Sequence, residues 1–439
     1  MSFKPVRLLL AIVLVVVVWM IACGPVPGAR AEDKDSPYQE IQLLTDVLSI
    51  IQKNYVEEVD LHVLIEGAIK GMTETLDPHS NFMPPEVYRE MKIDTRGEFG
   101  GLGIEITIRD GLLTIVAPIE DTPADRAGLQ SGDQIVRIDG KLTKSLSIME
   151  AVKLMRGPAG SPLKLTIMRD SLEKPQEYEI VREIIQIKSV RARLLDQGIG
   201  YVRLTQFQER TAEDLTAALQ QLRSESGAVL TGLILDLRNN PGGLLDQAVK
   251  VSDLFLPSGL IVYTEGREDG SKMRFSAHQQ DTEPDYPLVV LIDEGSASAS
   301  EIVAGALQDH RRAVVLGTQS FGKGSVQTII PMSDGSGLRL TTARYFTPHG
   351  TSIQARGITP DIPVRQIVIE PAANAGDEHS REANLENHFE PIEPEKNPDT
   401  DKQVQSRLQA EDLKDYQLMR AFDLLKGLRV FSRADKKAA

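Results

Sequence analysis

The chain has 439 residues, of which 41% are hydrophobic and 26% charged, so it is globular and long enough for two or three domains. Its 49 basic and 63 acidic residues give a formal net charge of -14, which argues against a nucleic-acid partner because phosphate binding needs a basic surface. Cys23 is its one cysteine, so neither a disulfide nor a catalytic thiol is expected in the mature protein.

The N-terminus, residues 1–31, has the organisation of a secretory signal. Lys4 and Arg7 precede an apolar run from residue 8 to 23, and Ala29-Arg30-Ala31 supplies a small-x-small cleavage pattern. An uncleaved membrane anchor and a lipid anchor on Cys23 remain as alternatives. All three place the rest of the chain outside the cytoplasm, so a periplasmic location, with or without attachment to the cytoplasmic membrane, is expected.

Residues 37–92 are predicted to form a small helical region. Ser36-Pro37 is typical of a helix start, and apolar residues then recur at helical spacing from Ile41 to Tyr55. A second helix is expected from residue 62 to 76, where Asp77-Pro78 ends it.

Residues 95–172 are predicted to form a compact β module. Short apolar stretches at 103–108, 112–116, 134–138 and 163–168 alternate with Gly, Asp and Pro turns. One helix interrupts them, with Ile148, Val152 and Met155 on a single face.

Residues 173–369 alternate strands with helices, which predicts an α/β domain. Strands are expected at 199–204, 233–237, 288–292 and 313–316, and helices at 211–223, 244–254 and 299–309. Whether the sheet is parallel or mixed stays open. Residues 370–412 are acidic, contain proline and read as a linker, and 413–433 are predicted to hold a C-terminal helix that docks on the body or on another chain.

The segment 293–301, Asp-Glu-Gly-Ser-Ala-Ser-Ala-Ser-Glu, leaves an apolar strand and opens a helix. A serine in such a turn has an exposed hydroxyl, and the helix N-terminus offers free N–H groups to a developing oxyanion. The alternative is a capping box made by Ser298 and Glu301. The segment also lacks the Gly-x-Ser-x-Gly spacing of hydrolases, and its three alternating serines are equivalent on these grounds.

Lys323 lies between two glycines in Phe321-Gly-Lys-Gly324, and strand alternation would put it on one side with Ser325 and Gln327. A lysine acts as a base only when burial lowers its pKa from about 10.4 towards ~7–8. Gln327 would be a suitable neutral neighbour, because a carboxylate would keep the lysine charged. The alternative is a solvated surface lysine.

Two glycine-rich turns add to these candidates. Asp236-Leu-Arg-Asn-Asn-Pro-Gly-Gly243 ends a strand and could present backbone N–H groups to an anion, although it also fits a tight turn. Gly100-Gly-Leu-Gly-Ile104 could bind a chain-terminal carboxylate while the peptide adds as a strand, in the manner of PDZ domains. Its apolar pocket would be lined by Leu102, Ile104, Ile106, Val152 and Met155.

The chain resembles the C-terminal processing, or tail-specific, serine peptidases from about residue 38 to 369. Five segments resemble family motifs in family order: 76–83 (Leu-Asp-Pro-His-Ser-Asn-Phe-Met), the Gly101-Leu102-Gly103 loop, 237–243, 295–301 and 321–327. The resemblance implies that Ser298 is the nucleophile, Lys323 the general base and Gln327 its orienting partner.

The resemblance further implies an oxyanion hole made by the N–H of Ala299 and that of Gly242 or Gly243, and it implies no metal and no other cofactor. Arg156 resembles a position through which the PDZ module signals ligand occupancy. The expected fold class is therefore α/β and multidomain, with an N-terminal helical region, a PDZ-like β module, an α/β peptidase core carrying a Ser/Lys dyad and a C-terminal helix. The expected substrates are polypeptides with exposed C-termini; an adaptor protein and a homo-oligomer are further possible partners.

Other functions fit the sequence less well. Residues 317–324 nearly spell a nucleotide-binding P-loop but end in Gly where Ser or Thr must hold Mg²⁺. Ser320-Phe-Gly-Lys323 matches the Ser-x-x-Lys of penicillin-recognising enzymes without the partner motifs. His310 would lie about 18 Å from Ser298 along one helix, which excludes it as a base, whereas His349 stays open. A PDZ-bearing peptide-binding scaffold without peptidase activity is the remaining alternative.

Overall fold

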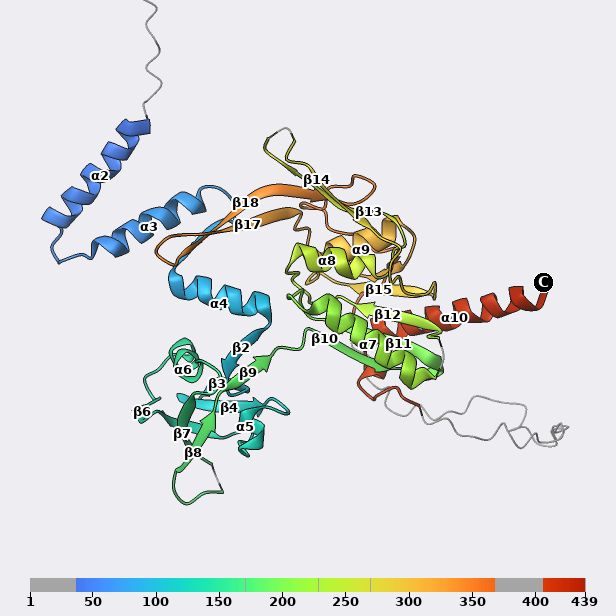
Figure 1. Cartoon of the computed structure of the whole chain (residues 1–439), viewed down its shortest axis with the longest axis horizontal. Helices are drawn as coiled ribbons and strands as arrows, with labels where there is room; N and C mark the ends of the chain where they lie inside the picture. Colours follow the sequence, from blue (N-terminus) through green and yellow to red (C-terminus); the bar gives the residue numbers. More distant parts are fainter. Residues whose placement is uncertain (1–36, 170, 228, 269, 368–405, 439) are drawn as a thin grey trace, which may run out of the picture. The chain divides into compact units, whose positions relative to one another are not determined.

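The computed structural model describes residues 37–169, 171–227, 229–268, 270–367 and 406–438 (Figure 1). The chain divides into two compact units, Met1–Leu76 and Asp77–Ala439. The predicted signal or anchor, residues 1–31, and most of the predicted linker lie outside the described residues. Among the helices that are described, none has the length and apolar character needed to span a membrane.

The first unit contains two helices, α2 (Pro37–Asn54) and α3 (Leu61–Glu74). Asp60 caps α3, since its carboxylate accepts a hydrogen bond of 2.8 Å from the backbone N–H of His62. Both helices occur where the apolar periodicity predicts them, and α3 ends at Glu74, four residues before Pro78.

The β module is an antiparallel sheet in the order β3-β4-β5-β7-β8, with the short β6 on β5. Its strands are β3 (Ile104–Arg109), β4 (Leu112–Pro118), β5 (Gln134–Ile138), β6 (Lys141–Leu142), β7 (Pro162–Met168) and β8 (Gln176–Val181). Two helices, α5 (Pro123–Arg126) and α6 (Ile148–Met155), complete it. Strand β3 is at the edge of this sheet, and α6 contacts it, so a groove with one unpaired strand edge runs beside α6.

The α/β region is built on a second sheet in the order β10-β11-β12-β15-β16-β19. Its strands are β10 (Val190–Leu194), β11 (Ile199–Leu204), β12 (Gly232–Asp236), β15 (Leu288–Ile292), β16 (Val314–Gly317) and β19 (Ile362–Pro363). Strand β10 is antiparallel to β11 and the other neighbours are parallel, so the sheet is mixed. Every residue of β12 and β15 is buried, because helices cover both faces.

Three helices cover one face of this sheet and one covers the other (Figure 1). Helices α7 (Thr211–Ser226), α8 (Leu245–Asp253) and α9 (Ala299–Asp309) pack on the side chains of Leu233 and Leu235. Helix α10 (Tyr416–Ala438) packs on the opposite face, against Ile234. The 3₁₀ turn η1 (Asp196–Gly198) connects β10 to β11, and the 3₁₀ turn η3 (Asp412–Lys414) precedes α10.

A further antiparallel sheet, which the sequence analysis did not predict, joins segments from both ends of the second unit. It comprises β1 (Asn81–Met83), β18 (Gly337–Phe346), β13 (Gly259–Gly266) and β14 (Met273–Ala277), with β17 (Ser325–Pro331) also paired to β18. Helix α4 (Pro85–Arg96) follows β1, and β2 (Glu98–Gly101) pairs with β9 (Glu183–Gln186). The β17–β18 ribbon begins two residues after Lys323, so it sets the course of that loop.

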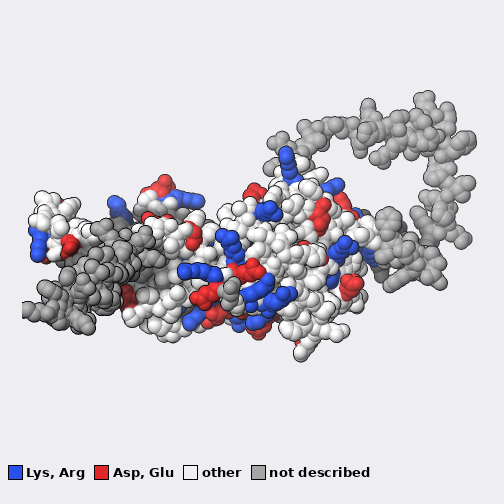
Figure 2. Space-filling view, turned by 90° about the horizontal axis from the view of Figure 1, so that it is seen from above, with Lys and Arg blue, Asp and Glu red and all other residues white. Residues whose placement is uncertain are grey.

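This architecture confirms the predicted mixed α/β, multidomain fold class, while the domain boundaries given above stay predictions. The face shown in Figure 2 carries basic and acidic side chains intermixed rather than separated by sign. Among the described residues, that face therefore gathers no field of a single sign.

Candidate active site

Ser298 occupies the turn between β15 and α9 in a strained backbone conformation. Its φ of 56° and ψ of -112° lie outside the regions that L-residues prefer, at a cost of about 1–3 kcal/mol. Such strain persists only where the surroundings hold it, and it places the side chain at the start of a buried helix. The predicted strand-to-helix turn is therefore present, with Ser298 at its corner.

Lys323 lies in the loop between β16 and β17, and its flanking glycines pack closely on a neighbouring segment. A Cβ on Gly324 would lie 2.4 Å from the Gln354 nitrogen, and Gly322 has a φ of +91°. The glycines thus let this loop approach residues 354–357.

Glu301 joins these two turns. Its carboxylate is fully buried and accepts four hydrogen bonds. One oxygen accepts from the Ser320 hydroxyl at 2.6 Å and from the Gly322 N–H at 2.6 Å. The other accepts from the N–H groups of Ser298 at 2.8 Å and Lys323 at 2.9 Å. The capping interaction treated above as an alternative to catalysis is present, and it ties the two candidate catalytic residues to one side chain.

One cavity of about 380 Å³ brings together Ser298, Lys323 and Gln327. Its lining also includes Ala299 and Gly243, and the charged residues in it are Asp94, Lys323 and Arg339. We call it the Ser298 cavity; its remaining lining residues are Met91, Thr95, Gln206, Phe207, Pro241, Leu244, Leu245, Ile302, Ser325, Val326, Ile329 and Tyr345. The three predicted catalytic residues therefore face one space, although they come from two separate segments, 295–301 and 321–327.

The Gln327 amide is held by two hydroxyl groups. Its Nε2 donates to Ser325 Oγ at 3.0 Å and to Thr341 Oγ1 at 3.3 Å. Thr341 in turn donates to the Asp77 carboxylate at 3.1 Å. Since its donors are used in this way, Gln327 keeps its carbonyl oxygen to accept from an amine.

Burial lowers the pKa of the Lys323 amine, and the positive charge of Arg339 lowers it further. The carboxylates of Asp77 and Glu301 act in the opposite direction. Burial and Arg339 outweigh the two acids, so the pKa of Lys323 lies below its usual value. Within the described part of the chain, the Lys323 amine makes no ion pair.

Tyr345 lies between the two turns as well. Its buried hydroxyl donates to the backbone oxygen of Lys323, and its backbone N–H donates to the Gly324 oxygen at 3.0 Å. The same hydroxyl shares a hydrogen bond with the Ser298 side chain, and burial raises the pKa of Tyr345. Since the single phenolic proton is used on Lys323, the Ser298 hydroxyl is the donor in this contact.

The glycine turn after β12 lies directly beside Ser298. A Cβ on Gly242 would stand 2.8 Å from the Ser298 Cβ and 2.9 Å from the Ala299 nitrogen. Asn240, fully buried, accepts from the Gly242 N–H at 2.9 Å. In the described part of the chain the N–H groups of Ala299 and Gly243 have no acceptor, so these two donors are available to a bound group.

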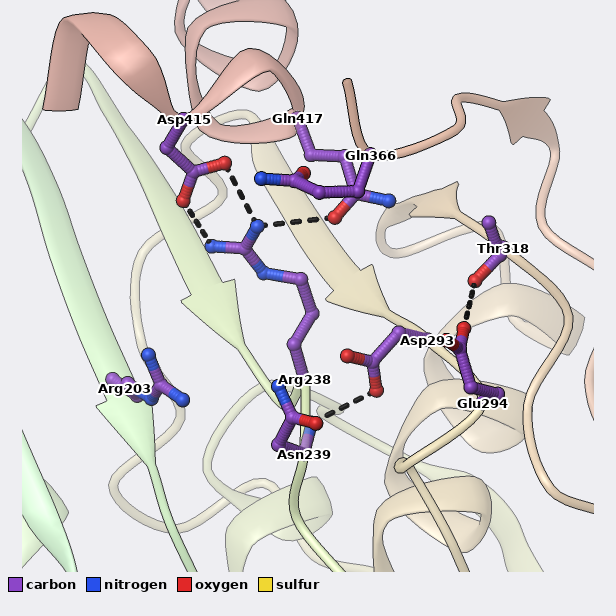
Figure 3. A pocket seen from close by; sticks show the side chains of 9 residues that line it. All are labelled: Arg203, Arg238, Asn239, Asp293, Glu294, Thr318, Gln366, Asp415 and Gln417. Atoms are coloured by element: carbon purple, nitrogen blue, oxygen red, sulfur yellow. Dashed lines mark hydrogen bonds and ion pairs between the residues drawn. The ribbon is translucent and has the colours of Figure 1, made fainter. Parts of the chain in front are cut away.

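Arg238 ties this turn to α10 across a second cavity of about 500 Å³ (Figure 3). Its guanidinium bonds to the Asp236 carboxylate at 2.9 and 2.7 Å and to that of Asp415 at 2.9 and 2.7 Å. A fifth hydrogen bond, of 3.0 Å, reaches the Gln417 side chain. All five guanidinium protons are thereby used, which makes this residue structural.

The predicted tail-binding residues share a small pocket of about 80 Å³ beside β3 and α6, which we call the Gly103 pocket. Its lining comprises Phe99, Gly101, Leu102, Gly103, Ile104, Ile106, Val152, Met155 and Arg156. Gly103 has a φ of +78°, and a Cβ there would come within 2.3 Å of Thr122. A side chain at residue 103 would therefore force the loop or Thr122 to shift.

Arg156, at the end of α6, contacts two residues outside that helix. It forms an ion pair with Glu90 of α4, and its guanidinium stacks 4.6 Å from the Phe99 ring centroid. Helix α4 also contributes Met91, Asp94 and Thr95 to the Ser298 cavity. Arg156, which lines the Gly103 pocket, thus contacts the helix that lines the Ser298 cavity.

The two histidines considered as bases have other partners. His310 Nε2 bonds to the Leu260 oxygen at 2.7 Å, and exposed His349 pairs with Asp309 at 3.4 Å. Neither lines the Ser298 cavity. Sequence reasoning missed the roles of Asn240, Tyr345 and Arg339; Glu301 alone carried a usable signal, its three-residue spacing from Ser298.

Comparison with known proteins gives three family matches. Residues 198–364 match peptidase family S41, residues 114–169 a PDZ domain, and residues 26–87 the N-terminal domain of the activating protease CtpB. A carboxy-terminal-processing protease of Bartonella bacilliformis is 52% identical over 335 residues, which is 76% of this chain and 77% of that protein.

A carboxyl-terminal-processing protease of Synechocystis is 44% identical, covering 69% of this chain and 71% of the relative. The solved structure of a photosystem II D1 C-terminal processing protease matches 74% of this chain and 93% of its own at 30% identity, with a TM-score of 0.43, which is too low to bear on the fold. On the basis of the family matches and these sequence identities, the chain belongs to peptidase family S41 and is a serine-type peptidase that carries a PDZ domain.

Proposed function

We propose that this peptidase cleaves polypeptides near their C-termini with Ser298 as nucleophile and Lys323 as general base. The observation that carries the proposal is that both residues line one cavity, in which the Lys323 amine is desolvated, unpaired and depressed in pKa. A neutral amine can accept the hydroxyl proton, whereas a solvated lysine could not.

The reaction follows from these contacts. A substrate carbonyl displaces the Ser298 hydroxyl from Tyr345, and Lys323 takes its proton as the serine oxygen attacks. The N–H groups of Ala299 and Gly243 stabilise the oxyanion, because Gly242 donates its own N–H to Asn240. Lys323 then protonates the leaving amine, and water hydrolyses the acyl-enzyme. Gln327 accepts from the Lys323 amine and orients it.

Tail recognition is proposed for the Gly103 pocket. A peptide would add as a strand along the free edge of β3, its last side chain entering the apolar pocket and its carboxylate meeting the N–H groups of residues 101–103. Arg156 is proposed to report occupancy, since it lines this pocket and pairs with Glu90 on the helix that borders the Ser298 cavity.

The cellular setting is also a proposal. The basic, apolar and small-residue pattern of residues 1–31 supports export from the cytoplasm, to the periplasm or to the outer face of the cytoplasmic membrane. An adaptor could deliver substrates. Exposed apolar side chains on the first unit, among them Ile41, Val47 and Val63, support a homo-oligomer through these helices.

The proposed function is tested on peptide pairs that differ only in a free or amidated C-terminus. The wild-type protein should cleave the free peptides faster, Ser298→Ala should cleave neither, and the exposed-site control Ser333→Ala should match the wild type. Equal cleavage of both members of every pair would contradict the proposed recognition of free C-termini. Cleavage by Ser298→Ala would show that Ser298 is not the nucleophile.

A further inference from the structure

Arg339 is a charged residue of the Ser298 cavity that the proposed mechanism does not use. It lies on β18 opposite Ile329 of β17, and Thr341, two residues further, lies opposite Gln327. Residues two apart on a strand share a face, and the Thr341 side chain contacts Gln327 at 3.3 Å. Arg339 therefore projects from the same face of the ribbon as the partner of Gln327.

The guanidinium of Arg339 has no acidic partner. It is partly buried, yet among the described residues it forms neither an ion pair nor a side-chain hydrogen bond. Two acids lie near: Asp94, which lines the cavity from α4, and Asp77, which is already bonded to Ser80 and Thr341. The positive charge that lowers the pKa of Asp94 is that of Arg156, and in the described part of the chain Arg339 forms no ion pair with either acid.

A partly buried arginine whose five donors meet no acceptor among the described protein groups is suited to bind an anion. Its planar fork matches a carboxylate with two parallel hydrogen bonds. The cavity that it lines is where a substrate must lie if Ser298 attacks it. The missing anion is therefore expected on the substrate.

We propose that Arg339 is a specificity residue that binds a carboxylate of the substrate close to the cleaved bond. The inference rests on the proposed function and adds a charge preference to it. The carboxylate has two possible sources, an Asp or Glu side chain near the cleaved bond or the terminal carboxylate of a short leaving segment, and the experiment separates them.

A second effect distinguishes this role from a purely structural one. The charge of Arg339 opposes protonation of Lys323, whereas Asp77 before β1 and Glu301 on α9 favour it. Removing the guanidinium while the two acids remain should raise the pKa of Lys323. Cleavage of an uncharged peptide by Arg339→Gln should then need a higher pH than cleavage by the wild type.

The test measures kcat/KM on uncharged peptides into which one Glu, one Lys, or Gln as the neutral match, is placed at successive positions around the cleaved bond. A second set varies the length of the leaving segment with free and amidated ends. The variants are Arg339→Gln, Arg339→Lys and Arg339→Glu; the control is Arg344→Gln, which removes an exposed arginine of the same strand.

For the wild type and the control, kcat/KM should be about tenfold higher with Glu than with Gln at one position, or with a free than with an amidated end on a short leaving segment. Arg339→Gln should lose that preference, Arg339→Lys should keep part of it, and Arg339→Glu should favour Lys at the same position. The proposal is overturned if Arg339→Gln keeps the wild-type preference for the carboxylate. It is also overturned if the wild type shows no such preference in either peptide set. If the wild type cleaves no peptide in a Ser298-dependent way, the proposed function itself is wrong. Labelling of Ser298 by a fluorophosphonate in Arg339→Gln shows that this variant is folded.

Discussion

The backbone N–H groups of Ser298 and Lys323 donate to the same oxygen of the Glu301 carboxylate, at 2.8 and 2.9 Å. The strained turn after β15 and the glycine-flanked loop after β16 therefore share one buried acceptor. Their relative position therefore does not depend on a contact between the Ser298 and Lys323 side chains.

Replacing Glu301 with Gln should disturb both turns at once. The carboxamide offers one acceptor oxygen, and its NH₂ group would face N–H donors, so we expect a loss of about 2–3 kcal/mol of stability and of most activity. Urea unfolding and kcat measure the two effects. Glu213→Gln, an exposed position on α7, should change neither; full activity in Glu301→Gln would show that the shared acceptor is dispensable.

Replacing Gly242 with Ala should strongly reduce kcat while leaving peptide binding intact. The new Cβ would lie 2.7 Å from the Ala297 oxygen and 2.8 Å from the Ser298 Cβ, so the turn must move away from the nucleophile. Displacing one oxyanion donor costs about 10²- to 10³-fold in kcat. The matched control is Gly71→Ala, where a Cβ meets nothing within 4 Å. Unchanged kcat in Gly242→Ala would place the oxyanion elsewhere.

Replacing Gly103 with Ala should remove the preference for free C-termini. The methyl group would overlap Thr122, so the loop must shift and the Gly103 pocket must change shape. We expect cleavage of free and amidated peptides to become equal, as measured by kcat/KM on each pair. Ile108→Ala, at an exposed position of β3, the strand that follows Gly103, should retain the difference. Retention of the preference in Gly103→Ala would show that tails are recognised at another place.

Much of this fold follows from local patterns. The predicted strands at 199–204 and 288–292 and the helix at 299–309 have the same bounds in the structure, because each is a dense apolar run between clear breakers. The β1–β18 pairing could not be predicted, since it joins Asn81 to Arg339 across more than half of the chain. Short strands that pair at long range carry no local signal of their partner.

In the candidate site, too, some residues could be predicted from local motifs and others depend on the tertiary fold. Ser298, Lys323 and Gln327 were singled out from their motifs, whereas Tyr345 and Asn240 act through contacts that only the folded chain creates. Arg339 looked like one of many charged strand residues, because its uncompensated charge depends on which acids the fold leaves out of reach. Residue type and spacing thus identified the candidate residues, and tertiary packing determines which neighbouring groups contact them.

Replacing Asp415 with Ala should loosen α10. The buried Arg238 would lose two of its five hydrogen bonds, for which we expect about 3 kcal/mol. Hydrogen bonds and the charge of Arg238 hold the pKa of Asp415 below its usual value. A depressed carboxyl pKa stabilises the folded state above about pH 4 and loses that effect as the pH falls through the folded-state pKa. Urea unfolding at pH 7 and pH 3 should show a smaller difference in Asp415→Ala than in the wild type or in the exposed control Asp423→Ala; equal differences would contradict this role.

The rate at which a fluorophosphonate acylates Ser298, followed from pH 5 to 11 in the wild type and in Lys323→Met, tests the dyad most directly. Lys323 must be neutral to accept the proton, so the wild-type rate should rise with pH to a plateau whose midpoint lies below the usual lysine value of about 10.4. Lys323→Met should react slowly and without that midpoint. If Lys323→Met acylates at the wild-type rate with the same pH profile, another group activates Ser298 and Lys323 is not the base.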